Sequence, residues 1–103
     1  MKSGSSEKVY EKAQYMIISV SNGFIVYNTN KPFEDGHTHL HSFSMAKTII
    51  DNCIKKRKPR TNNIYLLTSH IRVTDDEEYA KFIRELIHAK KSKQKQTYRN
   101  RSK

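Results

Sequence analysis

The sequence predicts an α+β fold, in which a small antiparallel sheet of three to four strands carries two amphipathic helices packed on one face. Two β-rich runs on either side of Ser21-Asn22-Gly23 indicate a tight hairpin, because Asn and Gly tolerate the backbone angles of such turns. Apolar residues then recur at helical spacing twice, in residues 45–54 and in residues 79–87. A chain of 103 residues has room for one domain with a small core.

The N-terminal half of the chain supplies most of the predicted strands. Residues 1–14 are expected to form a flexible lead-in or, over residues 7–13, a short helix. Residues 15–20 and 24–27 are the two strands of the hairpin. After a loop that contains Pro and Asp-Gly, residues 37–41 are expected to form a third strand.

The first predicted helix follows these strands. Ser42 or Ser44 is a suitable N-cap, since a serine hydroxyl accepts a hydrogen bond from a backbone N–H of the first turn. Pro59 ends the helix, because proline has no N–H to donate. One face of this helix carries Met45, Ile49, Ile50, Cys53 and Ile54.

The C-terminal half is expected to add one strand and one helix. Residues 64–67 form a short β-rich run that predicts a further strand. Thr74-Asp75-Asp76-Glu77 has the pattern of a capping box and places acids at the positive end of a helix. The apolar periodicity of this second helix ends at Ile87, so residues 15–89 form the predicted domain, in the order (α)βββαβα.

Positive charge is concentrated in two parts of the chain. Lys and Arg outnumber Asp and Glu 20 to 10, and much of the excess lies in one run before and after Pro59. Lysines at a helix C-terminus complement the helix dipole, which accounts for the start of this run better than for the rest. Clustered cations without acids attract polyanions such as phosphate backbones. We therefore expect phosphate contacts from Lys55, Lys56, Arg57, Lys58 and Arg60, with a merely solvated loop as the alternative.

The second basic run is the C-terminal tail, residues 90–103, which contains no acid. It has few apolar residues, a composition typical of segments that are disordered when free. Basic tails of this kind bind nucleic acid, and Tyr98 is available to stack on a base. The expected contacts come from Lys90, Lys91, Lys93, Lys95, Arg99 and Arg101.

Three histidines at alternate positions, His37, His39 and His41, suggest a metal site as a further possibility. Alternate residues of a strand point to one face, and an adjacent pair of imidazoles can chelate zinc. The outer two are about 13 Å apart on a strand, too far to share one ion. We therefore predict no metal and no cofactor, and treat the histidines as part of a polar sheet surface.

Catalytic motifs are missing from the sequence. A two-histidine phosphoesterase needs a second His-x-Thr/Ser element, but His70 is followed by Ile and Arg. Nothing marks Cys53, the only cysteine, as activated, and a lone cysteine excludes an internal disulfide. No apolar run resembles a signal peptide or a membrane span, so we expect no membrane association and a cytoplasmic protein.

Several polar and aromatic residues around the hairpin are candidates for reading bases. Tyr15 and Tyr27 flank it, and three asparagines are close in sequence. Such residues are equally common in ordinary strands and turns. The asparagines are Asn22, Asn28 and Asn30.

Three strands followed by a helix resemble, in topology alone, the arm-type DNA-binding modules of tyrosine recombinases, in which a three-stranded sheet enters a groove. This resemblance covers about half of the chain and involves no shared motif. The sequence as a whole predicts a small, basic, non-enzymatic protein that binds DNA or RNA. The alternative is a protein-binding accessory or inhibitor, of the kind found in phages and mobile elements, that acts on a nucleic-acid enzyme.

Overall fold

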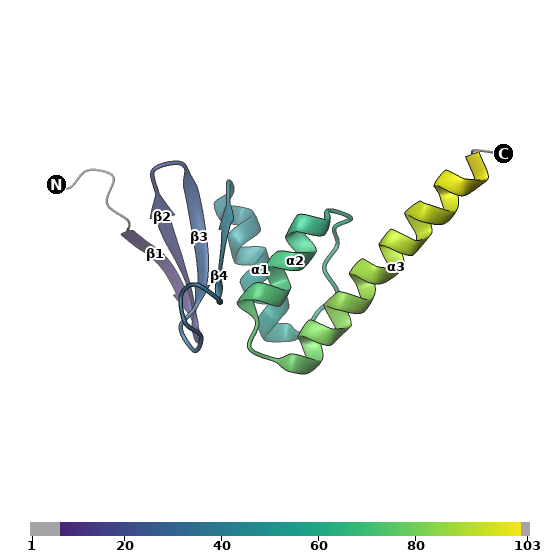
Figure 1. Ribbon diagram of the computed structural model, residues 1–103. Helices are drawn as coiled ribbons and strands as arrows, with labels where there is room; N and C mark the ends of the chain where they lie inside the picture. Colours follow the sequence, from purple (N-terminus) through teal and green to yellow (C-terminus); the bar gives the residue numbers. More distant parts are fainter. Residues whose placement is uncertain (1–6, 102–103) are drawn as a thin grey trace.

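The structure, a computed structural model, describes the backbone of residues 7–101 and the side chains of residues 7–90. Within this part of the chain, four strands precede three helices (Figure 1). The strands form one antiparallel sheet in the order β1-β2-β3-β4, so the predicted α+β class is confirmed. The elements are β1 (Glu7–Lys12), β2 (Tyr15–Val20), β3 (Gly23–Asn28), β4 (His37–Leu40), α1 (Phe43–Lys55), α2 (Ile64–Val73) and α3 (Glu77–Arg101).

The predicted hairpin is confirmed as β2–β3. Val20 pairs with Gly23, so Ser21 and Asn22 form the turn. Gly23 has a φ of 154°, and a Cβ atom at this position would lie 2.4 Å from the Leu40 carbonyl oxygen of β4. Glycine is therefore required here because of both the backbone angle and the close approach of β4.

The N-terminal segment corrects the sequence prediction, because Glu7–Lys12 is the edge strand β1 instead of a short helix. Its charged, exposed side chains are typical of edge strands, and they conceal the alternation that marks buried strands. Only Tyr10 turns toward the core, where its ring meets Phe43 edge-on with centroids 6.0 Å apart. Pairing with β2 therefore determines the conformation of this segment.

The first helix begins where the sequence predicts. Ser42 is the N-cap of α1, and its hydroxyl accepts a hydrogen bond from the Met45 N–H at 3.2 Å. The helix ends at Lys55, and Lys56 adopts the left-handed conformation with φ 56°. The chain thus leaves the helix before Pro59, which lies in the following loop.

The strand predicted at residues 64–67 is wrong, because this segment begins helix α2. The Asn63 side chain caps the helix and accepts a hydrogen bond from the Leu66 N–H at 3.3 Å. Buried Leu67, His70 and Val73 follow one another at three-residue spacing, which is a helical pattern. The pattern was missed because it depends on counting a histidine among the core residues.

The last helix begins close to where the sequence predicts, but its cap is Asp76 instead of Thr74, the first residue of the predicted capping box. The Asp76 carboxylate accepts hydrogen bonds from the N–H groups of Glu78 and Tyr79 at 2.9 and 3.2 Å. The helix then continues to Arg101, so the backbone of the tail is helical where the sequence led us to expect disorder. Residues 77–101 contain neither Gly nor Pro and are rich in Lys, Arg, Gln and Glu, which favour helix.

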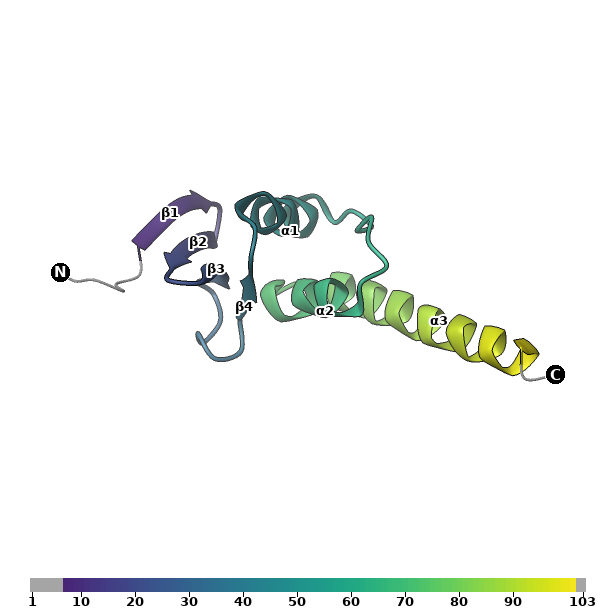
Figure 2. The same cartoon turned by 90° about the horizontal axis from the view of Figure 1, so that it is seen from above.

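The elements form layers, with α1 and α2 on one face of the sheet and α3 against α2 (Figures 1 and 2). The two helices on the sheet are therefore α1 and α2, whereas α3 leads away from the sheet toward the C-terminus. The buried core extends from Tyr15, Ile17, Val26 and Leu40 of the sheet to Ile50, Leu67 and Ile83 of the helices. Strand β1 contributes only the partly buried Tyr10, which packs against this core. None of the described helices has the combination of length and apolar content that a membrane crossing requires.

Candidate nucleic-acid interface

The basic loop between α1 and α2 is held in place at several points. The Arg57 N–H donates to the Asn52 carbonyl at 3.0 Å, and the Arg57 carbonyl accepts from the Tyr79 hydroxyl at 2.6 Å. Pro59 is buried, whereas Lys58 and Arg60 on either side of it are exposed. The loop therefore presents its cations on an ordered backbone, and it need not be ordered upon binding.

One predicted phosphate contact is already engaged within the protein. The Lys56 ammonium lies 2.8 Å from the Asp76 carboxylate, which also caps α3. This lysine, together with the N–H groups of the first turn, holds the pKa of Asp76 below its usual value. Lys56 therefore joins the end of α1 to the start of α3, and it is a weaker candidate for phosphate than its exposed neighbours Lys55 and Arg57.

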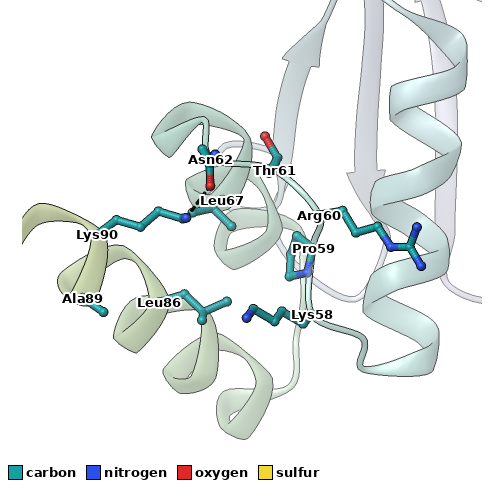
Figure 3. Close-up of a pocket in the computed structure, with 9 residues that line it drawn as sticks. All are labelled: Lys58, Pro59, Arg60, Thr61, Asn62, Leu67, Leu86, Ala89 and Lys90. Atoms are coloured by element: carbon teal, nitrogen blue, oxygen red, sulfur yellow. Dashed lines mark hydrogen bonds between the residues drawn. The ribbon is translucent and has the colours of Figure 1, made fainter. Parts of the chain in front are cut away.

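The loop and α3, together with Leu67 of α2, border an open cavity of about 630 Å³, which we call the basic cavity. Lys58 points from the loop toward Leu86 of α3, and Lys90 of α3 points back toward the loop (Figure 3). The Lys90 ammonium donates to the Asn62 side-chain oxygen at 2.6 Å. The cavity is lined by Lys58, Pro59, Arg60, Thr61, Asn62, Leu67, Leu86, Ala89 and Lys90.

All the charged residues that line the basic cavity are cations, since no acidic residue is among its described lining residues. Lys58 and Lys90 come from segments 32 positions apart in the numbering, yet they border the same space. The Arg60 guanidinium projects from the other side of the loop, away from α3 (Figure 3). Cations that converge without a neighbouring carboxylate create a positive potential suited to a phosphate group.

The first turns of α3 have a different character. Glu77, Glu78 and Glu85 border the same shallow depression as Lys81 and Arg84. Charges of both signs largely cancel at a distance, so this surface is a poor polyanion site. Among the described side chains, cations without neighbouring acids are therefore concentrated at the loop and at Lys90.

The cations of the tail can be placed only in part. Lys90 lies at the basic cavity, which brings the predicted tail and the predicted loop together. The side chains of the other predicted tail contacts lie outside the described residues, although their backbone continues α3. These are Lys91, Lys93, Lys95, Arg99 and Arg101.

The three predicted histidines do not gather into a metal site. His37 stacks on Phe33 with ring centroids 4.1 Å apart, and its Nδ1 donates to the Phe33 carbonyl at 2.6 Å. The ring of His39 meets His37 edge-on at 5.1 Å, and His41 lies beyond the end of β4. Within the described residues, no group of three or more His, Cys, Asp or Glu side chains is arranged to hold a metal ion.

The prediction that Tyr15 and Asn28 could read bases is wrong, because both are buried in the core, with 1% and 0% of their surfaces exposed. Asn28 donates to the Val73 carbonyl at 2.8 Å and so joins the sheet to the end of α2. Asn30 is exposed but donates to Asp75 at 2.9 Å. Asn28 and Asn30 therefore make contacts within the fold, and Tyr15 is not accessible to a base.

Cys53 and His70 lie next to each other in the core and have no access to a substrate. Burial raises the pKa of the Cys53 thiol to about 12, so the reactive thiolate is absent at neutral pH. Burial likewise lowers the pKa of His70, whose Nδ1 donates to the Leu66 carbonyl at 2.7 Å and whose Nε2 lies 3.1 Å from the Asn52 amide. Both groups contribute to packing.

Sequence reasoning missed the residues that organise the basic loop. Tyr79 looked like a core residue, and its hydroxyl bond to Arg57 spans 22 positions in sequence. Asp76 was predicted only as part of a capping pattern, and Asn62 was not singled out, but they bind Lys56 and Lys90. No local sequence signal indicates such long-range partners.

Comparison of the chain with protein-family models, with curated proteins and with solved structures found no match in any of the three.

Proposed function

We propose that this chain binds nucleic acid without catalysis, through phosphates held at the basic cavity. The observation that supports the proposal most strongly is the convergence of Lys58 and Lys90 on one cavity that has no acidic lining residue among those described. Arg60 and Lys55 extend the positive surface around the loop. Phosphate contacts position a protein on a strand without reading its sequence, so the proposal covers DNA and RNA alike.

Rigidity of the loop is a second support for this proposal. The bonds of Arg57 to Asn52 and Tyr79 and the burial of Pro59 fix the backbone between the cations. A pre-ordered loop loses less conformational entropy upon binding than a free one.

We assign such a protein to the cytoplasm, where an unpaired and buried cysteine is ordinary.

The test is fluorescence anisotropy with labelled DNA and RNA at low salt. The triple variant Lys58→Gln, Arg60→Gln, Lys90→Gln should bind at least about tenfold more weakly than the parent protein. The control Lys8→Gln, Lys81→Gln, Arg84→Gln removes the same formal charge elsewhere and should bind nearly as well as the parent. Equal losses in both variants would mean that net charge, and not this cavity, is responsible.

A protein partner remains the second candidate, and one observation favours it. Met45 and Tyr65 are 40% and 54% exposed, and both border a second cavity, at the N-terminus of α2. Exposed apolar groups beside a basic surface are common where a protein docks. Co-elution of the purified protein with nuclease-sensitive material that absorbs at 260 nm would favour nucleic acid instead.

A further inference from the structure

A second cavity, of about 360 Å³, lies at the N-terminus of α2. Asn62 and Leu67 line the basic cavity, whereas their chain neighbours Asn63 and Leu66 line this one. The rest of its wall comes from the β2–β3 turn, the end of β4 and the first turn of α1. We call it the Tyr65 cavity. Its volume lies in the range typical of small-ligand sites, about 300–1,000 Å³.

Tyr65 is the most conspicuous residue of this cavity. Its side chain is 54% exposed, more than any other large hydrophobic residue described. The hydroxyl donates to the His39 carbonyl at 2.7 Å, and this bond also covers part of the exposed edge of β4. The ring is thus tethered at its far end while much of its surface stays open to solvent. A fixed and exposed aromatic ring is the feature on which proteins stack unpaired bases.

The polar groups around the ring suit the edges of a base. His39, His41 and Asn22 are exposed and line the cavity, and they offer both donors and acceptors. Asn63 uses its side-chain oxygen to cap α2, which leaves its amide N–H groups available on the same residue. Met45 adds an apolar contact.

The electrostatics of the Tyr65 cavity are compatible with a nucleic-acid strand. Its described lining residues include no acid. The two helices whose N-terminal ends border it, α1 and α2, have no acidic residue in their first turns. Neither the Tyr65 cavity nor the basic cavity therefore has a carboxylate among its described lining residues.

We propose that the Tyr65 cavity binds an unpaired nucleobase, which stacks on Tyr65 while the basic cavity, which borders the same end of α2, holds the phosphates of the same strand. This inference rests on the proposed function and names single-stranded nucleic acid as the ligand. A base within a duplex has both faces covered by its neighbours and is not available for stacking on protein. A protein partner is less favoured, because only Met45 and Tyr65 among the exposed large hydrophobic residues line the cavity, and stable protein interfaces bury about 1,000 Å² or more.

The test compares three labelled probes of equal length: an oligothymidylate, an abasic oligonucleotide with the same phosphates, and a duplex. We expect the oligothymidylate to bind more tightly than the other two. Tyr65→Ala should weaken oligothymidylate binding by roughly 5- to 100-fold and leave abasic binding nearly unchanged. Tyr65→Phe keeps the ring and should retain most of the affinity, even though it loses the bond to His39.

Phe33→Ala is the matched control, because Phe33 is 44% exposed and lies outside both cavities. It should bind all three probes like the parent protein. Photocrosslinking of an oligonucleotide that contains 5-iodouracil gives an independent readout on the unaltered protein. Peptide mapping should locate the crosslink at Tyr65 or at another residue of this cavity.

Three results would overturn the inference alone: equal binding of abasic and base-containing strands, equal losses for both probes in Tyr65→Ala, or crosslinks that map outside the cavity. A cavity that docks a protein side chain instead predicts that Tyr65→Ala leaves oligothymidylate binding unchanged. If the parent protein binds none of the probes, including the abasic strand at low salt, then the proposed function fails as well.

Discussion

Removal of the Tyr79 hydroxyl group should lower the stability of the fold and weaken binding at the basic loop. Tyr79 is 3% exposed, and its hydroxyl donates to the Arg57 carbonyl at 2.6 Å. Tyr79→Phe deletes this bond and keeps the ring that packs in the core, so it creates almost no cavity. Because Arg57 is exposed, water can hydrate the freed carbonyl, and the cost should stay near the ordinary net value of about 1 kcal/mol.

The same substitution should weaken binding. The loop keeps its bond to Asn52 and the burial of Pro59, so it loosens without melting. If one residue must be reordered upon binding, the entropic cost is about 1 kcal/mol, which corresponds to about fivefold weaker affinity. In thermal unfolding, a loss of 1 kcal/mol lowers the Tm by about 4–8 °C for a domain of this size.

Tyr27→Phe is the control, because the Tyr27 hydroxyl also donates to a backbone carbonyl, that of Lys31, at 2.9 Å. This bond lies in the β3–β4 loop, away from the basic cavity. The control should lose similar stability and retain the parent affinity in anisotropy measurements. Equal binding by Tyr79→Phe and Tyr27→Phe, or an unchanged Tm in Tyr79→Phe, would refute the role assigned to the Tyr79 hydroxyl.

Three further predictions concern pH, the tail and metal. Burial places the pKa of His70 below its unfolded value of about 6.5, so the unfolded chain takes up the proton first as the pH falls. The free energy of unfolding in urea should therefore decrease below about pH 6.5, with a slope from this residue of at most about 1.4 kcal/mol per pH unit; a flat profile that matches His70→Gln would contradict this. Deletion of residues 91–103 should weaken polyanion binding and leave calorimetric unfolding cooperative, since the core ends before them, and a non-cooperative transition would show that they pack on the domain. A chelator should leave the Tm unchanged, and elemental analysis should detect no stoichiometric metal; one metal per chain would reverse our interpretation of His37, His39 and His41.

Local signals predicted the parts of the fold that depend on few neighbours. The turn at Ser21-Asn22-Gly23, the Ser42 cap and the acids before α3 each depend on residues within one turn of one another. Helical spacing predicted the inner face of α1, on which Ile49, Ile50 and Cys53 are buried, but it also placed Met45 there, which is 40% exposed.

The elements that sequence reasoning misjudged depend on tertiary contacts. β1 is a strand because it pairs with β2, and α2 is a helix whose inner face includes the buried His70. Only the fold brings Lys58 and Lys90 to the same cavity and pairs Lys56 with Asp76. The basic composition predicted an affinity for phosphate, but it did not distinguish the cations that face the cavity from the one that stabilises the helix junction.

The salt dependence of binding tests the central claim most directly. Each neutralised phosphate contributes about −0.9 to the slope of log K against log salt on duplex DNA. The parent protein should show a slope of roughly −4 to −7, which corresponds to about five to eight phosphates. In the triple variant at Lys58, Arg60 and Lys90, the slope should be less negative by about 2 to 3, whereas in the control variant at Lys8, Lys81 and Arg84 it should match the parent. An unchanged slope in the first variant would show that phosphates do not bind at the basic cavity.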